Sequence, residues 1–212
     1  KNNLLKAELQ AISFSINIEV DLGDNVHKEP VQLFYPPFQP LPNSEIYFQH
    51  LLEQSRRLIF GGKGITLILL DDYQLRMQLT SQLAAEFGTR VIHENTVLAA
   101  NAILLCRWCW WLHHQDYLSQ PSQLRVALLP IPSLESPLTA AKVSFLKGSG
   151  RDWFRELLLP EALNTFSQSI SPLRKRNILL AILDGRLRSR SWGEEFLQVI
   201  EPWVPVYRLL PN

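Results

Sequence analysis

The chain has 212 residues, of which 46% are hydrophobic and 19% are charged, and its net charge is +1. This length suits one large domain, and the balanced charge excludes an overall basic field, so any nucleic-acid contact must come from local patches. No segment has the apolar length of a membrane span, and no signal-peptide pattern opens the chain. The only cysteines, Cys106 and Cys109, make no disulfide framework and favour a cytoplasmic location. Because the first residue is Lys1, we expect a domain of a longer polypeptide.

The first third of the chain alternates extended and helical patterns. Residues 14–20 alternate polar and apolar side chains and predict a strand, which a polar loop follows. Residues 32–35 predict a short strand, and the prolines after it hold the backbone extended. A helix is then expected from residue 43 or 44 to residue 60, where Gly61 and Gly62 end it.

The run ITLILL at residues 65–70 is almost wholly apolar, which is typical of a strand buried on both faces of a parallel sheet. Asp71 or Asp72 is the expected N-cap of a helix over residues 73–87. The later patterns predict strands at 90–93, 102–105, 125–129, 178–183 and 204–209, and helices at 137–147, 160–171 and 191–200. This alternation predicts an α/β domain with a mostly parallel sheet.

The densest basic region surrounds the strand predicted at residues 178–183. Arginine and lysine side chains precede and follow it at Arg174, Lys175, Arg176, Arg186, Arg188 and Arg190. They could contact phosphate groups, or they could form an ordinary solvated surface. Because they flank both ends of the strand, we expect them at opposite edges of the sheet. Asp184 is interpreted as a strand-end cap or ion-pair partner rather than a catalytic acid.

Four segments carry a family resemblance through their order and spacing. They are FYPPFQPLPNSEIYFQHLLEQSRRLIFGGKGITLILLDDYQLR, ILLCRWCWWLHHQD, LRVALLPIPSLESPLTAA and LLPEALNTFSQSISPLRKRNILLAILDGRLRSRSWGEEFL. Over about residues 31–200 the chain resembles the C-terminal motor domain of DinG/XPD-type superfamily 2 DNA helicases. In that family the last segment contains Q-x-x-G-R-x-x-R, which Gln168 begins here. Pro172 stands for the first arginine and Lys175 for the last, and Arg174 is one position off.

The resemblance implies a RecA-like three-layer domain over residues 31–212, with residues 1–30 as a strand and polar loop leading into it. It implies a second motor domain that closes over ATP and Mg²⁺, both held mainly by an N-terminal motor domain of the same polypeptide, and that contacts single-stranded DNA. A DNA-repair setting follows from the family. By this analogy the γ-phosphate is faced by Gln168, Arg174 and Lys175, and DNA is contacted by Trp110, Trp111, Arg188 and Arg190. The isolated domain should not hydrolyse ATP, because it has no Walker A sequence.

The departures from the family support a second hypothesis, a non-motor remnant that binds nucleic acid or docks a protein. Pro172 has no hydrogen to donate, and Lys175 lacks the planar fork of arginine. The tryptophans could equally pack against the end of the sheet instead of stacking on bases. A zinc site of Cys106, Cys109, His113 and His114 is conceivable, but buried thiols are favoured, and no metal site is predicted.

Overall fold

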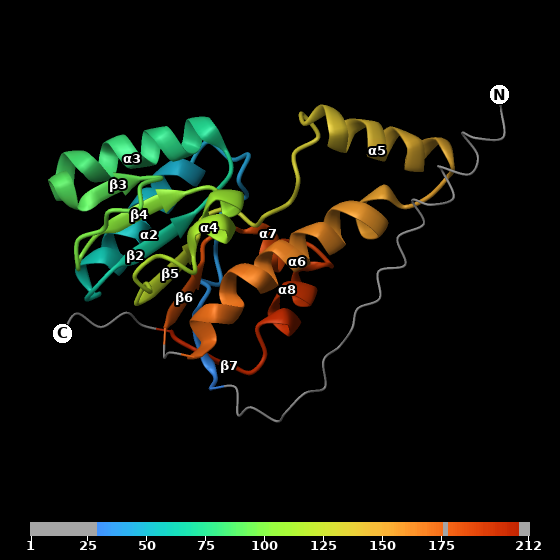
Figure 1. The fold of residues 1–212 in the computed structure, drawn as a ribbon. Helices are drawn as coiled ribbons and strands as arrows, with labels where there is room; N and C mark the ends of the chain where they lie inside the picture. Colours follow the sequence, from blue (N-terminus) through green and yellow to red (C-terminus); the bar gives the residue numbers. More distant parts are fainter. Residues whose placement is uncertain (1–28, 176–177, 208–212) are drawn as a thin grey trace.

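The computed structural model describes residues 29–175 and 178–207 (Figure 1). Its strands are β1 Val31–Phe34, β2 Thr66–Leu69, β3 Val91–His93, β4 Ile103–Cys106, β5 Gln123–Val126, β6 Leu179–Ile182 and β7 Trp203–Pro205. Its α-helices are α2 Tyr47–Phe60, α3 Tyr73–Phe87, α4 Trp108–His114, α5 Pro137–Gly148, α6 Leu159–Ile170, α7 Arg186–Ser189 and α8 Gly193–Val199. Short 3-10 helices η1 (Gly88–Arg90) and η3 (Ser171–Lys175) and a π-helix η2 (Phe154–Leu158) complete the described elements.

The seven strands form one sheet in the order β3-β4-β2-β5-β6-β1-β7, and every neighbouring pair is parallel. The predicted α/β class, with a RecA-like parallel sheet flanked by helices, is confirmed. Strand β1, the first in the chain, lies between β6 and β7, with Gln32 opposite Leu179 and Val204. Consequently, all strands end at the same edge of the sheet, which we call the carboxyl edge. Ligands of open α/β sheets usually bind there.

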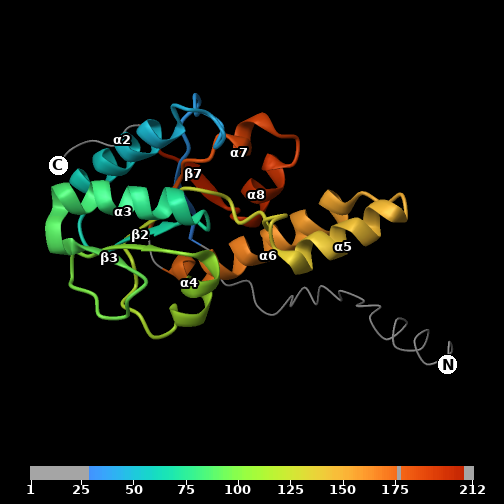
Figure 2. The same cartoon turned by 90° about the horizontal axis from the view of Figure 1, so that it is seen from above.

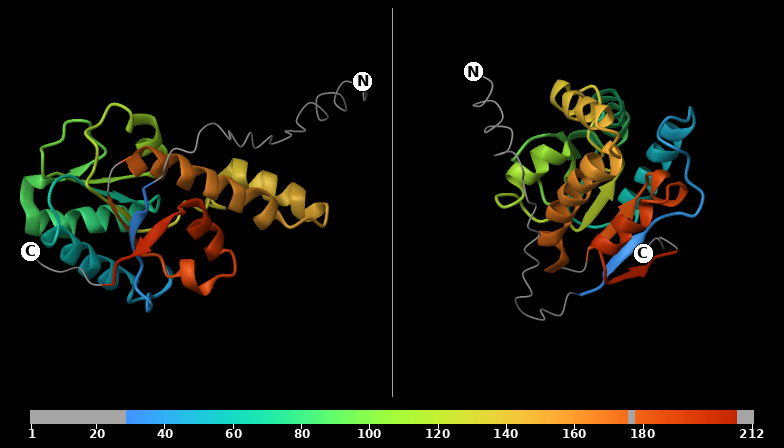
Figure 3. Two further views of the ribbon diagram at one scale, coloured as in Figure 1. Left: turned by 90° about the horizontal axis from the view of Figure 1, so that it is seen from below. Right: turned by 90° about the vertical axis from the view of Figure 1, so that its right-hand side faces the viewer.

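Helices cover both faces of the sheet. On one face α2 and α3 pack over Ile68 and Leu70, and on the other α4, α6 and α8 pack over Leu67 and Leu69. These consecutive residues point alternately to the two faces, so the apolar run predicted as a doubly buried strand is β2. Figures 2 and 3 show α5 lying alongside α6 and projecting beyond the sheet.

The predicted elements match the structure closely, with local differences. Helix α3 has the predicted bounds, and Asp72 caps it by accepting a hydrogen bond from the Leu75 amide at 2.7 Å. Strand β5 starts two residues earlier than predicted and ends before Ala127. Helix α4 was not predicted, and the strand predicted at residues 14–20 lies outside the described residues. Within the described ranges no helix is both long and apolar enough to cross a membrane.

Candidate functional site

Carboxylate side chains along the carboxyl edge accept hydrogen bonds from backbone amides. Asp71 accepts from the amide of Trp108 at 3.0 Å, at the start of α4, while Asp72 caps α3. Glu94 accepts from the amide of Arg107, also at 3.0 Å. These amides are the groups that would receive an anionic ligand at a helix N-terminus. A phosphate arriving here would have to displace a carboxylate that belongs to the protein.

Asp184 joins the ends of β5 and β6. Its side chain is fully buried and accepts from the amides of Leu129 at 2.9 Å and Arg186 at 3.0 Å. The Arg186 guanidinium closes the arrangement, with Nη2 2.6 Å from Oδ2 of Asp184. The interpretation of Asp184 as a cap and ion-pair partner is confirmed. Because this buried carboxylate neutralises Arg186, the guanidinium is not free to bind another anion.

A cavity of about 790 Å³ opens beside this pair. Asp71, Asp72 and Glu135 line it with acidic groups, and Arg186 is its one cationic lining residue. Burial raises the pKa of Asp71 above its usual range, against the lowering effect of the Trp108 amide. The carboxyl end of β2 therefore presents an acidic surface.

The residues predicted to face the γ-phosphate lie at the opposite edge. Gln168 is exposed on α6 and donates to Oδ1 of Asn164 at 3.1 Å. Arg174 donates from Nη1 to the carbonyl oxygen of Glu201 at 2.7 Å and from Nη2 to that of Val199 at 3.1 Å. Burial lowers the pKa of Arg174. Arg174 thus holds the end of α8 in place, with both terminal nitrogens engaged.

Lys175 is the last residue of η3 and so also precedes β6, while Arg176 lies outside the described residues. As the sequence suggested, the basic residues are split between the two edges of the sheet. Arg174 and Lys175 come before β6, and Arg188 and Arg190 come after it. The structure therefore does not bring the predicted phosphate-facing and DNA-contacting cations together.

The two predicted stacking tryptophans differ in exposure. Trp111 is 1% exposed and donates from Nε1 to the carbonyl oxygen of Ser169 at 3.2 Å, so it belongs to the core between α4 and α6. Burial leaves no face of Trp111 for a nucleic-acid base, and this corrects its predicted role. Trp110 is half-buried, and the His114 ring stacks on it with 4.2 Å between centroids. Only Trp110 of this pair retains exposed surface.

The imagined zinc site is not assembled in the part of the chain that the structure describes. No group of three or more histidine, cysteine or acidic side chains there could hold a metal ion. Cys106 is buried, which raises the pKa of its thiol, whereas Cys109 is exposed. Nδ1 of His113 lies 2.6 Å from the carbonyl oxygen of Cys109. Cys106 is therefore a buried thiol, as the sequence favoured. Cys109 is exposed, so the expectation of a buried thiol is wrong for this residue.

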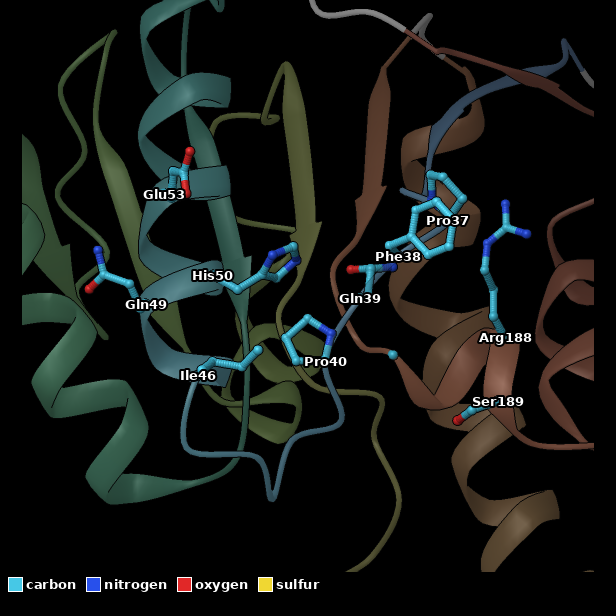
Figure 4. Close-up of a pocket in the computed structure, with 11 residues that line it drawn as sticks. Pro37, Phe38, Gln39, Pro40, Ile46, Gln49, His50, Glu53, Arg188 and Ser189 are labelled. Atoms are coloured by element: carbon cyan, nitrogen blue, oxygen red, sulfur yellow. The ribbon is translucent and has the colours of Figure 1, made fainter.

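Arg188 lies at the carboxyl edge on α7. Its guanidinium carbon is 4.2 Å from the centroid of the Tyr35 ring, and the side chain is exposed. Beside it is a cavity of about 630 Å³ lined by the proline-rich residues 37–40, α2 and α7. Figure 4 shows its lining side chains, among them Phe38 and His50. Phe38, between Pro37 and Pro40, was not predicted from the sequence as a site residue.

Comparisons with known proteins relate the chain to DNA helicases. It is 28% identical over 138 residues to the ATP-dependent DNA helicase YoaA of Escherichia coli, covering 63% of this chain and 22% of that protein. The YoaA of Haemophilus influenzae is 23% identical over 186 residues, covering 81% and 29%. A protein of Bacillus subtilis named 3'-5' exonuclease DinG is 33% identical over 78 residues, covering 35% and 8%. The chain thus spans less than a third of each of these relatives.

A solved structure, Xpd4 of S. tokodaii, has the same fold with a TM-score of 0.55. The match has 13% sequence identity and covers 79% of this chain and 37% of that one. No family model matches the chain.

Proposed function

This chain carries a DinG/XPD-type helicase domain, and from that premise we propose that it is the second of two RecA-like domains in a longer polypeptide. Its role is to bind single-stranded DNA. Arg174 does not act as the phosphate-sensing arginine of an ATP-driven motor.

The position of Arg174 carries the second part of this proposal, that the domain lacks the phosphate-sensing arginine, whereas DNA binding is inferred from the helicase relatives. Both terminal nitrogens of its guanidinium donate to main-chain carbonyl oxygens at the end of α8. An arginine that stabilises a phosphoryl-transfer transition state must direct those donors at the phosphate. Pro172, at the position of the family's first arginine, has no side-chain donor.

The described residues at the carboxyl edge do not fit the γ-phosphate of ATP. Carboxylates hold the amides at the starts of α3 and α4, and Asp184 neutralises Arg186. Acidic side chains line the neighbouring cavity. ATP and magnesium, if the longer polypeptide uses them, would bind chiefly outside this domain. These features favour the non-motor hypothesis over a complete motor.

The motor hypothesis, in which this domain closes over ATP, is kept as the second candidate because Lys175 stands at the position of the family's last arginine. A lysine can supply charge there, although not a bidentate fork. Lys175 and Arg174 therefore have to be tested separately.

The test is steady-state ATP hydrolysis by the full-length polypeptide, with and without single-stranded DNA, for wild type, Arg174→Ala and Lys175→Ala. We expect DNA binding without DNA-stimulated hydrolysis in the wild type. Loss of a working arginine finger would lower the rate by about 10³- to 10⁵-fold. DNA-stimulated hydrolysis in the wild type that falls by this factor in folded Arg174→Ala would refute the proposal. The same fall in Lys175→Ala alone would establish the motor hypothesis instead.

A further inference from the structure

The cavity beside Arg188 has a groove-like form that three segments build. The extended residues Pro37–Pro40 form one wall, the start of α2 a second, and α7 a third. We call it the Phe38 groove; its lining includes Phe38, Gln39, His50, Arg188 and the acidic Glu53. Its volume of about 630 Å³ is within the range of small-molecule sites.

Phe38 is held in an unusual position for an apolar side chain. It is 91% exposed, while the neighbouring Gln39 points inward and donates to the carbonyl oxygen of Ile182 at 3.0 Å. The prolines on both sides restrict the backbone, and Gly185 lets the segment approach closely, since a Cβ there would lie 2.4 Å from the carbonyl oxygen of Pro40. The backbone that carries the ring is thus already fixed, so a partner that stacks on the ring pays little conformational entropy to order this segment.

The cationic side of the groove is available to a ligand. Arg188 lies on the Tyr35 ring and makes no ion pair within residues 29–175 and 178–207. Arg190, also exposed, lines an adjoining cavity of about 430 Å³ together with Arg188. This contrasts with Arg174 and Arg186, whose guanidinium groups are held by the protein itself.

Two polar atoms lie buried beneath the groove. Among the described residues, Oε1 of Gln39 and Nε2 of His50 have no hydrogen-bond partner, and Figure 4 shows the two side chains directed toward each other. Burial lowers the pKa of His50, which favours a neutral imidazole at pH 7. Neither atom is exposed, so Phe38 and Arg188 form the surface that the groove offers to a ligand.

We propose that the Phe38 groove binds single-stranded nucleic acid, with one base stacked on Phe38 and a backbone phosphate held by Arg188. An exposed aromatic face beside an exposed cation that makes no ion pair among the described residues matches an unstacked nucleotide. A duplex does not offer the face of a base, so the groove should select single strands. This inference rests on the proposed DNA-binding function and gives it a location.

The experiment measures binding of the 212-residue chain to a fluorescein-labelled oligothymidylate of about 15 nucleotides by fluorescence anisotropy at several salt concentrations. Phe38→Ala should weaken binding by about 5- to 100-fold, because base–aromatic stacking contributes on that scale. Arg188→Ala should reduce the slope of log K against log salt by about 0.7, as expected for one lost phosphate contact.

Phe145→Ala is the matched control, because Phe145 is a 69% exposed phenylalanine on α5, distant from the groove in the fold. It should bind as the wild type does. An oligonucleotide of equal charge with abasic sites should bind wild type and Phe38→Ala equally, since no base is left to stack. If Phe38→Ala binds thymidylate as tightly as Phe145→Ala does, the groove is not the site, while the proposed DNA-binding function stands. If the wild type binds no single-stranded DNA, both proposals fail.

Discussion

Arg125 should destabilise the fold, and replacing it with methionine should stabilise it. The side chain is fully buried on β5, and of its three nitrogens only Nη2 has a partner, Oε1 of Gln123 at 2.9 Å. Burial lowers the pKa of Arg125 to about 9, well below the ordinary value of arginine. At about 1.4 kcal/mol per tenfold change in proton affinity, the buried cation costs roughly 5 kcal/mol at neutral pH.

Methionine keeps the apolar stem of Arg125 and removes the charge. Gln123 then loses its donor, which costs about 1–3 kcal/mol, so we expect a net gain of about 2–4 kcal/mol in the free energy of unfolding. Urea unfolding followed by circular dichroism measures this gain as a higher midpoint with an unchanged slope.

Arg76 supplies the control, because it is similarly buried but donates from both Nε and Nη1. It donates to the carbonyl oxygens of Leu70 at 3.0 Å and Asp71 at 2.9 Å and to Nε2 of His93 at 3.1 Å. Arg76→Met should therefore lower the free energy of unfolding by about 2–5 kcal/mol. If the free energy of unfolding of Arg125→Met is lowered as in Arg76→Met, the buried charge of Arg125 does not destabilise the fold. A bound water or anion would then satisfy its unpaired nitrogens.

The pH dependence gives a second test of Arg125. Its folded-state pKa lies below the unfolded value, so between about pH 9 and 12.5 the unfolded chain binds more protons than the folded one. The free energy of unfolding of the wild type should therefore contain a contribution from Arg125 that increases as the pH rises above about 9. Arg125→Met should lack this contribution, and comparing the two urea midpoints at pH 8 and about pH 10 measures it.

Three further predictions concern the carboxyl edge. Asp184→Asn should lower the free energy of unfolding by about 3–5 kcal/mol, measured in urea, because it leaves Arg186 without its counter-charge; an unchanged midpoint would contradict the role of this pair. Gly185→Ala should destabilise by more than about 1 kcal/mol, whereas Gly148→Ala, whose added Cβ meets nothing within 4 Å, should be neutral or stabilising by thermal denaturation. Because the folded-state pKa of Asp71 is raised, the free energy of unfolding should fall as the pH rises from 3.8 through that pKa. Asp71→Asn should remove this fall from a plot of melting temperature against pH. An unaltered plot would exclude Asp71 as its source.

The sequence predicted most of the fold, because its local signals agree with the tertiary structure. The N-cap signal at Asp71 or Asp72 predicted α3 with its observed bounds, and the apolar run at residues 65–70 predicted β2. The predicted resemblance to DinG/XPD-type helicases is confirmed by the helicase relatives and by the XPD-like fold. Helix α4 was missed, because its aromatic residues Trp108 and Trp111 give no clear helical polarity until α6 is seen to cover them.

The candidate site was less predictable, because its residues are defined by distant partners. Arg174 looks like a free cation in the sequence, yet its acceptors are carbonyl oxygens 25 and 27 residues later. Arg188 looks equivalent, but it lies on Tyr35, more than 150 residues earlier in the chain, with its charge still accessible. Sequence composition reports that arginines are present, and only the fold decides which of them remain available.

The place of β1 in the sheet has a consequence for the order in which this chain can fold. Its hydrogen-bonding neighbours, β6 and β7, are the last two of the described strands in chain order, so β1 leaves the ribosome long before these partners exist. Sheet pairing between remote segments is slow, and an unpaired strand can associate with other chains. The β3-β4-β2-β5 portion can assemble from contiguous sequence, whereas β1 must wait for β6 and then be enclosed by β7. Synthesis of β6 and β7 is therefore the step that commits the Phe38 groove, whose anchoring segment follows β1 directly, to its final form.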